Sequence, residues 1–157
     1  MQKITPFLWF DGKAEEAVRF YTSIFKDSKV GSITRYGNAG PGPKGTVMTA
    51  TFQIHGQEFI ALNGGPQFTF SPAISLVVNC ETQEEVDRLW EKLSEGGAKQ
   101  QCGWLTDRYG LSWQIVPTVL GKLVQDKDAA KSARVMQAML AMEKLDIGLL
   151  KKAAEQR

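Results

Sequence analysis

The segment EEAVRFY at residues 15–21 returns at residues 84–90 as EEVDRLW. Both copies read Glu-Glu-x-x-Arg-apolar-aromatic, and both follow a run of apolar residues that is typical of a β-strand. This repeat predicts an internal duplication, in which each half of the chain begins with a strand and continues into a helix. The two helices therefore divide most of the chain into two similar halves.

The first half contains one predicted helix and four predicted strands. The helix covers Ala14–Phe25, whose apolar residues follow helical spacing, and a strand over Ile4–Phe10 precedes it. Further strands are predicted at residues 30–36, 46–54 and 57–62, with a hairpin turn at His55-Gly56. The loop between the first two of these, GNAGPGPKG at residues 37–45, is dense in turn-forming residues.

The second half repeats the order of the first. A strand is predicted over residues 72–79, and Thr82 is the expected N-cap of a helix over residues 83–95, with Glu85 completing a capping box. Strands at residues 99–106 and 111–117 follow. Because a sheet must bury one face under a second layer, we expect an α+β fold. In it the two halves form a curved mixed sheet around a cleft, with the helices outside.

The tail at residues 126–157 is predicted to be helical. Asp126 or Asp128 can cap its first helix and Asp146 its last. Methionine-rich apolar faces can grip a ligand or a partner, or pack on the sheet or across a dimer. The first helix of the tail is expected to carry two adjoining apolar stripes. One consists of Ala133, Met136 and Leu140, and the other of Val135, Met139 and Met142.

The length and composition fit one ordinary globular domain. The chain has 157 residues, 43% hydrophobic and 23% charged, with a net charge of +2. We divide this single domain into module one at about 1–67, module two at about 68–120 and a helical tail at about 126–157. The charges form no basic stripe, so nucleic acid is not an expected partner. Neither a signal peptide nor a membrane span is recognisable, and a cytoplasmic protein with reduced Cys80 and Cys102 is expected.

Aromatic side chains suggest where a small molecule could bind. In the first strand Thr5, Phe7 and Trp9 share one face, opposite the face that a helix is expected to cover. Ser112 and Gln114 share a face of the last strand, and Asn63 and Trp104 lie near strand ends. Apolar walls with a few polar groups are typical of ligand pockets. The same aromatic residues could instead simply fill the core.

Several segments resemble one known family. These are PFLWFDGKAEEAVRFY, GPGPKGTVMTATFQIHGQEF, LNGGP, CGWLTDRYGLSWQIVP and RVMQAMLAMEKLDI. They resemble the PhnB-like branch of the vicinal oxygen chelate superfamily, whose domain carries the name 3-demethylubiquinone-9 3-methyltransferase. The superfamily includes glyoxalase I, extradiol dioxygenases and the bleomycin and fosfomycin resistance proteins. The resemblance implies paired βαβββ modules and usually a homodimer.

The same resemblance implies where a metal would be held. Metal-dependent members place His, Glu or Gln on the first and last strands of each module. Here the matching position of the first strand is Thr5, the strand at 71–78 offers no ligand, and only Gln114 stands where members often have Glu. A divalent ion needs several converging ligands. We therefore expect no metal and no cofactor. Glu58, beside the hairpin turn, could still act as a metal ligand if the turn lay closer to the cleft than expected.

Two other chemistries find little support. His55, the single histidine, falls at the hairpin tip, where an exposed turn residue is expected rather than a catalytic base. The loop at 37–45 lacks the Gly-Lys-Ser/Thr of a phosphate-binding loop, and a mobile rim over the pocket is expected. No GxGxxG follows the first strand, which argues against a nucleotide-type methyl donor.

The sequence predicts a metal-free small-molecule-binding protein that forms a homodimer. Two alternatives stay open: a metal-dependent lyase, dioxygenase or transferase of the same superfamily, and a structural or interaction dimer with a vestigial cleft. Neither a membrane nor a nucleic acid is expected as a partner. The predicted ligand-binding residues are Thr5, Phe7, Trp9, Asn63, Trp104, Ser112 and Gln114.

Overall fold

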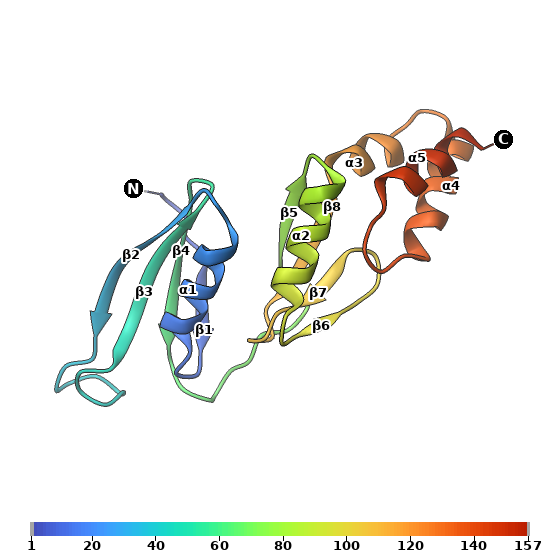
Figure 1. Cartoon of the computed structure of the whole chain (residues 1–157). Coiled ribbons are helices and arrows are strands. Elements are labelled where there is room, and N and C mark those ends of the chain that lie inside the picture. Colours follow the sequence, from blue (N-terminus) through green and yellow to red (C-terminus); the bar gives the residue numbers. More distant parts are fainter. Residues whose placement is uncertain (1, 157) are drawn as a thin grey trace. The chain divides into compact units, whose positions relative to one another are not determined.

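A computed structural model describes residues 2–156 of the chain. The chain divides into two compact units, Met1–Phe70 and Ser71–Arg157. Each unit holds one four-stranded mixed sheet and one helix in βαβββ order, and the second also holds the helical tail (Figure 1). The predicted α+β class, with two βαβββ modules and C-terminal helices, is confirmed. The cleft between the modules stays a prediction.

Module one contains a sheet of strand order β1-β4-β3-β2. Strand β1 (Phe7–Phe10) runs parallel to β4 (Gln57–Asn63), while β3 (Val47–Ile54) is antiparallel to both β4 and β2 (Ser28–Arg35). The helix α1 (Ala14–Ile24) connects β1 to β2. Because β1 and β4 are parallel, their carboxyl ends meet at the same edge of the sheet, and Phe10 pairs with Asn63 there.

The core of module one lies between α1 and one face of this sheet. Tyr21 of α1 is fully buried and stacks on Phe52, which stacks in turn on Phe59 with ring centroids 5.1 Å apart. Leu8 and Phe10 point to the same covered face and are also buried. Burying each side chain of this size contributes about 1.5–3 kcal/mol. This is why Ala14, Ala17, Val18 and Tyr21 appear at helical spacing in the sequence.

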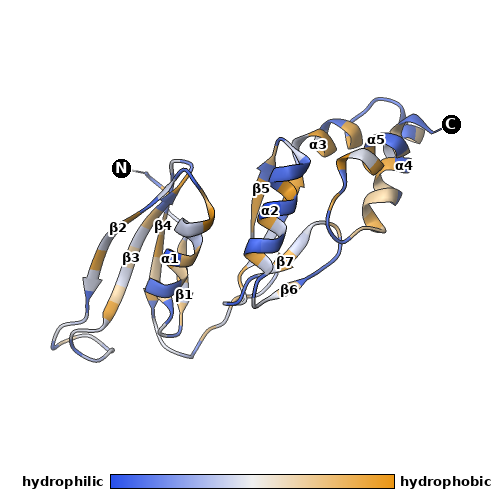
Figure 2. Cartoon of the chain, viewed as in Figure 1, coloured by the Kyte–Doolittle hydropathy of each residue, from blue (hydrophilic) through white to orange (hydrophobic). Residues whose placement is uncertain are grey.

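Module two repeats the arrangement, with strand order β5-β8-β7-β6. Strand β5 (Ser75–Cys80) is parallel to β8 (Ser112–Pro117), and α2 (Gln83–Ser94) covers one face. The predicted cap is present, because the Thr82 side chain accepts a hydrogen bond from the Glu85 N–H at 3.2 Å. Hydrophilic and hydrophobic stretches interleave along α2 (Figure 2), as expected for a helix with one face on a sheet.

One predicted strand of module two is wrong. Residues 99–106 form two short strands, β6 (Ala98–Lys99) and β7 (Trp104–Thr106), with a turn between them. In this turn Cys102 and Gly103 both adopt positive φ, at 61° and 82°. A side chain at Gly103 would come within 2.9 Å of the Ile115 carbonyl oxygen, so glycine lets the turn pack directly on β8. The tail also holds this turn, because Met142 accepts a hydrogen bond from the Cys102 N–H at 2.8 Å.

Within residues 2–156, three helices follow β8, and the first of them, α3 (Thr118–Val124), lies before the predicted tail and was not expected from the sequence. It has seven residues and contains a glycine, so its pattern is too short to stand out. Asp128 caps α4 (Ala129–Leu140) and Asp146 caps α5 (Ile147–Glu155), as predicted for these helices. Their apolar faces form a separate cluster with α3, made of Leu120, Val135, Leu145, Leu150 and Ala154.

The tail is joined to module two by polar contacts as well. The Gln83 side chain at the start of α2 donates to the Leu145 carbonyl oxygen at 3.0 Å and accepts from the Ile147 N–H at 2.7 Å. Lys144 and Asp87 form an ion pair at 2.9 Å. None of the helices within residues 2–156 combines the length and apolar character that crossing a membrane requires.

Candidate functional site

Each sheet packs one face against its helix, and we call the opposite face of each sheet its open face. On the open face of module one, Phe7 and Trp9 alternate with the buried Leu8 and Phe10. Phe7 is 55% exposed and pairs in register with Ile60, while Trp9 is half-buried beside Leu62. The predicted alternation of the first strand is therefore present, and the two aromatic side chains lie together on the open face.

Trp9 is held in place by the segment that follows β4. Its Nε1 donates to the Gly65 carbonyl oxygen at 2.9 Å, and its ring meets Phe68 edge-on with centroids 5.0 Å apart. A Cβ placed on Gly64 would come within 2.4 Å of the indole, so Gly64 permits the ring to lie against the backbone. Thr5, which was predicted to share this face, precedes β1; it is half-buried, and its hydroxyl lies 3.4 Å from Gln2 Nε2.

Module two presents its predicted residues on the open face of the second sheet. Trp104 of β7 pairs in register with Gln114 of β8, and both are half-buried. Gln114 Nε2 donates to Ser75 Oγ at 3.0 Å. Ser112 lies on the same face two residues earlier and is fully buried. Its hydroxyl has no hydrogen-bond partner within the part of the chain that the structure describes.

The side chain of Asn63, by contrast, makes hydrogen bonds that hold the elements of module one together. Its Oδ1 accepts from the Ala14 N–H at 2.8 Å, and its Nδ2 donates to the Val47 carbonyl oxygen at 3.1 Å. The helix begins after Lys13, whose side chain makes no capping hydrogen bond. Asn63 therefore supplies the missing cap of α1 from the end of β4. Both ends of its amide are already used.

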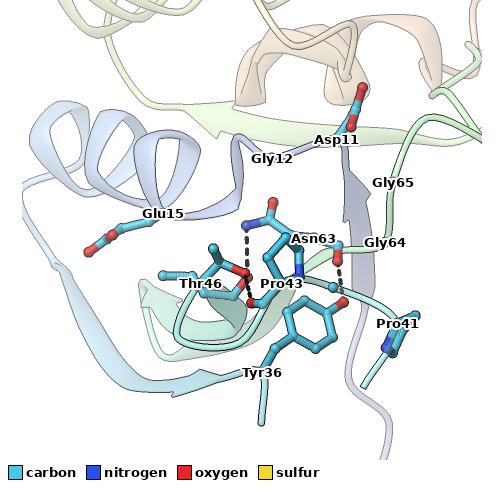
Figure 3. A pocket seen from close by; sticks show the side chains of 12 residues that line it. Asp11, Gly12, Glu15, Tyr36, Pro41, Pro43, Thr46, Asn63, Gly64 and Gly65 are labelled. Atoms are coloured by element: carbon cyan, nitrogen blue, oxygen red, sulfur yellow. Dashed lines mark hydrogen bonds between the residues drawn. The ribbon is translucent and has the colours of Figure 1, made fainter. Parts of the chain in front are cut away.

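Asn63 also lines a cavity of about 440 Å³ at the edge of the sheet where β1 and β4 end (Figure 3). The sequence reasoning missed the other lining residues. The sequence signal that could have indicated this cavity is the pair of glycine-rich stretches at 37–45 and 63–65. The second stretch ends β4 at the edge of the sheet where β1 also ends. The lining residues are Asp11, Gly12, Glu15, Tyr36, Pro41, Gly42, Pro43, Thr46, Val47, Asn63, Gly64 and Gly65.

The loop at 37–45 forms one wall of this cavity and is built around Tyr36. The Tyr36 ring is buried and lies against Gly40 and Gly42 of the loop. Its hydroxyl donates to the Asn63 carbonyl oxygen at 2.5 Å, and its backbone N–H donates to Thr46 at 2.8 Å. The loop therefore rims this cavity of module one, and Tyr36 fastens it to the end of β4. Whether it also rims the predicted cleft stays a prediction. Its predicted mobility stays a prediction.

The residues present do not fit the metal that the superfamily often uses. Within residues 2–156, no three side chains of His, Cys, Asp or Glu lie close enough together to hold an ion. Glu58 is half-buried at the start of β4, where its backbone is bound by the Gln2 side chain. His55 is exposed at the hairpin tip, with Nδ1 3.5 Å from Asp27. At the strand positions of module two where the resemblance implies ligands, the sequence has the neutral amide of Gln114.

The cysteines add no nucleophile to the open faces. Burial, with a smaller contribution from Glu85 and Glu81, raises the pKa of the Cys80 thiol to about 12. A thiol with this pKa stays protonated at neutral pH and reacts poorly. Both cysteines are free thiols. Cys102 lies in the turn between β6 and β7, away from the strand positions described above.

A known protein family and a solved structure resemble this chain over most of its length. Residues 2–116 match the family model described as 3-demethylubiquinone-9 3-methyltransferase. A PhnB protein from Bacillus cereus, titled a putative 3-demethylubiquinone-9 3-methyltransferase, is 49% identical. It covers 74% of this chain and all of its own, with a TM-score of 0.69. Searching the curated proteins found no match.

More distant structures share the fold alone. Protein PA1353 from Pseudomonas aeruginosa is 23% identical over 74% of this chain and 98% of its own, with a TM-score of 0.62. The fosfomycin resistance protein FosX from Listeria monocytogenes is 14% identical over 78% of this chain and 97% of its own, with a TM-score of 0.54.

Two βαβββ modules, each a four-stranded sheet with one helix, form the fold that the resemblance implied. The chain belongs to the 3-demethylubiquinone-9 3-methyltransferase family, the PhnB-like family that it was predicted to resemble. The helices α3, α4 and α5 lie beyond the matched residues 2–116.

Proposed function

We propose that this protein binds a small, partly aromatic molecule on the open faces of its sheets and does so without a metal ion. The observation that carries the proposal is the pair Phe7 and Trp9, two aromatic side chains kept accessible on a strand whose other face is buried. Exposed apolar surface of this kind commonly marks a binding site.

The open face of module two, taken by itself, offers polar groups that could recognise a ligand. The Gln114 amide uses its nitrogen on Ser75, which leaves its oxygen to accept a hydrogen bond from a ligand. The neighbouring Trp104 is half-buried and offers an apolar surface beside this amide. A few polar groups between aromatic side chains give a ligand both affinity and orientation.

Metal-independence follows from the chemistry of the side chains on these faces. The predicted binding residues offer aromatic rings, hydroxyl groups and the Gln114 amide, which bind divalent ions weakly compared with imidazole, thiolate and carboxylate. Glu58 of β4 adds a carboxylate to the face that carries Ile60 and Leu62, and a single carboxylate does not make a metal site. Asn63 was predicted as a ligand-binding residue, and we assign it instead a supporting role, because both ends of its amide hold module one together.

Fluorescence titration tests this function. Indole and 2-naphthol serve as probes, with Gln114→Leu and Phe7→Ser as site variants. Gln101→Leu is the matched control, since it removes an exposed amide from the turn between β6 and β7. We expect at least one probe to saturate with chelator present, and at least one site variant to weaken binding about three- to tenfold, as for one lost polar or aromatic contact.

Two results would overturn the proposal. One is the absence of any saturable signal with wild-type protein. The other is stoichiometric Zn, Ni, Mn or Fe in the protein as purified, combined with probe binding that disappears when the metal is removed. The second result would favour the metal-dependent enzyme.

We further propose that the chain forms a homodimer. The support is a set of large apolar side chains that are about half or more exposed on the two modules and are not among the proposed ligand-binding residues: Phe68, Ile74 and Val77. Light scattering coupled to size-exclusion chromatography measures the molar mass. A value near 35 kDa, twice the chain's 17.4 kDa, is expected, and a value of one chain mass would contradict it.

A further inference from the structure

Helix α4 is apolar on its outer side as well as on its inner side. On the inner side, Val135 is fully buried and Met139 packs against the cluster that joins α3, α4 and α5. On the outer side, Met136 is 40% exposed and Leu140 is 57% exposed. A surface helix normally turns charged or polar residues toward water, and a helix that is apolar all round is normally covered. The outer side of α4 therefore has the character of a covered surface.

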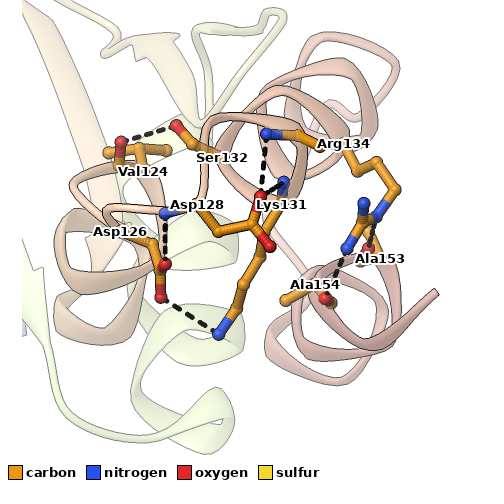
Figure 4. A network of polar contacts seen from close by, with 9 residues as sticks. Val124, Asp126, Asp128, Lys131, Ser132, Arg134, Ala153 and Ala154 are labelled. Carbon is orange, nitrogen blue, oxygen red and sulfur yellow. Dashed lines mark hydrogen bonds and ion pairs between the residues drawn. The ribbon is translucent and has the colours of Figure 1, made fainter. Parts of the chain in front are cut away.

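The two charged residues of α4 are used within the tail (Figure 4). Lys131 forms an ion pair with Asp126 at 3.0 Å. The Arg134 guanidinium donates to the carbonyl oxygens of Ala153 and Ala154 at the end of α5. Both charged side chains are half-buried. The outer side of α4 therefore carries no charge of the helix itself.

Two neighbouring helices turn charged residues toward solvent in the usual way. The exposed charged residues are Glu84, Arg88, Glu91 and Lys92 on α2, and Lys151, Lys152 and Glu155 on α5. The uncharged outer side of α4 is therefore a local feature of this helix and does not follow from the composition of the whole chain.

The exposed apolar residues of α4 form one stripe along the helix. At about 3.6 residues per turn, positions 129, 133, 136 and 140 lie within about 60° of one another around the helix axis. We call these four exposed residues the outer stripe: Ala129, Ala133, Met136 and Leu140.

The outer stripe is complementary to itself when two copies run antiparallel. Two small residues come first along the helix and two large residues follow. About a two-fold axis midway between positions 133 and 136, Ala129 lies level with Leu140 of the second copy. Ala133 likewise lies level with Met136 of the second copy. Each large side chain then meets a small one, so the helix axes can approach to about 8 Å.

We propose that α4 is a contact surface between two copies of this chain, in which the two outer stripes pack antiparallel. This pairing also places the positive end of each helix beside the negative end of the other. The contact goes beyond the homodimer proposed above, since it uses none of the residues that support that dimer. Helix α4 lies outside the residues 2–116 that match the family model, so the contact is not carried over from the family.

The size of the contact sets its expected strength. A single pair of short helices buries less than the roughly 800 Å² per partner of a stable interface. The α4 contact taken alone should therefore exchange readily, and a covalent trap is the appropriate assay.

Disulfide cross-linking supplies this trap. Ala129→Cys and Leu140→Cys are made separately in a Cys102→Ser background, where the remaining native cysteine, Cys80, is fully buried. In the antiparallel pair, positions 129 and 140 of different copies lie level and within reach of a disulfide. Two copies of the same position lie about 16 Å apart, which is the rise along α4 from 129 to 140. After mild oxidation the mixture of the two variants should cross-link, and either variant alone should not.

A charge placed in the outer stripe tests the apolar contact itself. Adding Met136→Lys to both cysteine variants should lower the cross-linked yield about fivefold or more. Leu149→Lys is the matched control, because it places the same charge at an apolar residue of α5 that is 52% exposed and lies outside the outer stripe. It should leave the yield unchanged.

Three results would overturn the α4 contact: no cross-link in the mixture, cross-links in either variant alone at the yield of the mixture, or equal losses with Met136→Lys and Leu149→Lys. The homodimer proposed above fails separately. A molar mass of one chain with a cross-linked mixture would refute that dimer and support the α4 contact. A molar mass of two chains without the cross-link would do the reverse.

Discussion

Replacing Asn63 with alanine should destabilise module one without touching its hydrophobic core. The side chain bridges three elements, because it caps α1 at the Ala14 N–H and donates to the Val47 carbonyl oxygen of β3 from the end of β4. The hydrogen bond from Tyr36 goes to the main chain of Asn63 and should survive the change.

The magnitude follows from the two lost hydrogen bonds. Loss of a helix cap costs about 1 kcal/mol. Leaving the Val47 carbonyl without its donor costs about another 1–2 kcal/mol, because the site is partly buried. We expect the Asn63→Ala variant to lose about 2–3 kcal/mol of unfolding free energy, and Asn63→Asp to lose less, because it keeps the acceptor for α1.

Urea unfolding followed by circular dichroism measures this loss. Asn79→Ala is the matched control, since Asn79 is an exposed asparagine of β5 in module two. It should change the unfolding free energy by less than about 0.5 kcal/mol. If Asn63→Ala were as stable as wild type yet failed to bind the small-molecule probes, Asn63 would be a ligand-binding residue, as the sequence suggested.

Three further predictions concern other parts of the chain. Gly64→Ala should displace the Trp9 indole, shift its emission and cost about 1–3 kcal/mol. Gly37→Ala, where an added methyl group meets nothing within 4 Å, should do neither. Arg134→Ala should lower stability by about 1–3 kcal/mol, because the guanidinium donates to two carbonyl oxygens at the carboxyl end of α5 (Figure 4). An unchanged melting curve would contradict this. Because burial raises the pKa of the Cys80 thiol to about 12, Cys80 should not react with a thiol reagent at pH 8 in the folded protein. Modification of both thiols, Cys80 and Cys102, would contradict this prediction.

Much of the fold was predictable because local signals agreed with the tertiary structure. The repeated helix segments, the Thr82 cap and the His55-Gly56 hairpin all appear where the sequence placed them. The strand at 99–106 was wrong for a non-local reason. Its turn is held by hydrogen bonds from Cys102 and Gly103 to residues 142–143 of the tail, which spacing within the strand cannot reveal.

The candidate site was less predictable. Alternation along β1 correctly separated Phe7 and Trp9 from Leu8 and Phe10, because period-two patterns report faces directly. The commitment of Asn63 to α1 and β3 was hidden, since it depends on contacts 16 and 49 residues away in sequence. The same is true of the cavity, whose walls meet only after β1 and β4 pair.

The most direct test of the central claim is a titration of the chelator-treated protein with 2-naphthol, repeated after addition of Zn²⁺ and Mn²⁺. Metal-free binding on the open faces predicts the same dissociation constant in all three samples, weakened in parallel by Gln114→Leu. Binding that appears only after a metal ion is added would contradict the account.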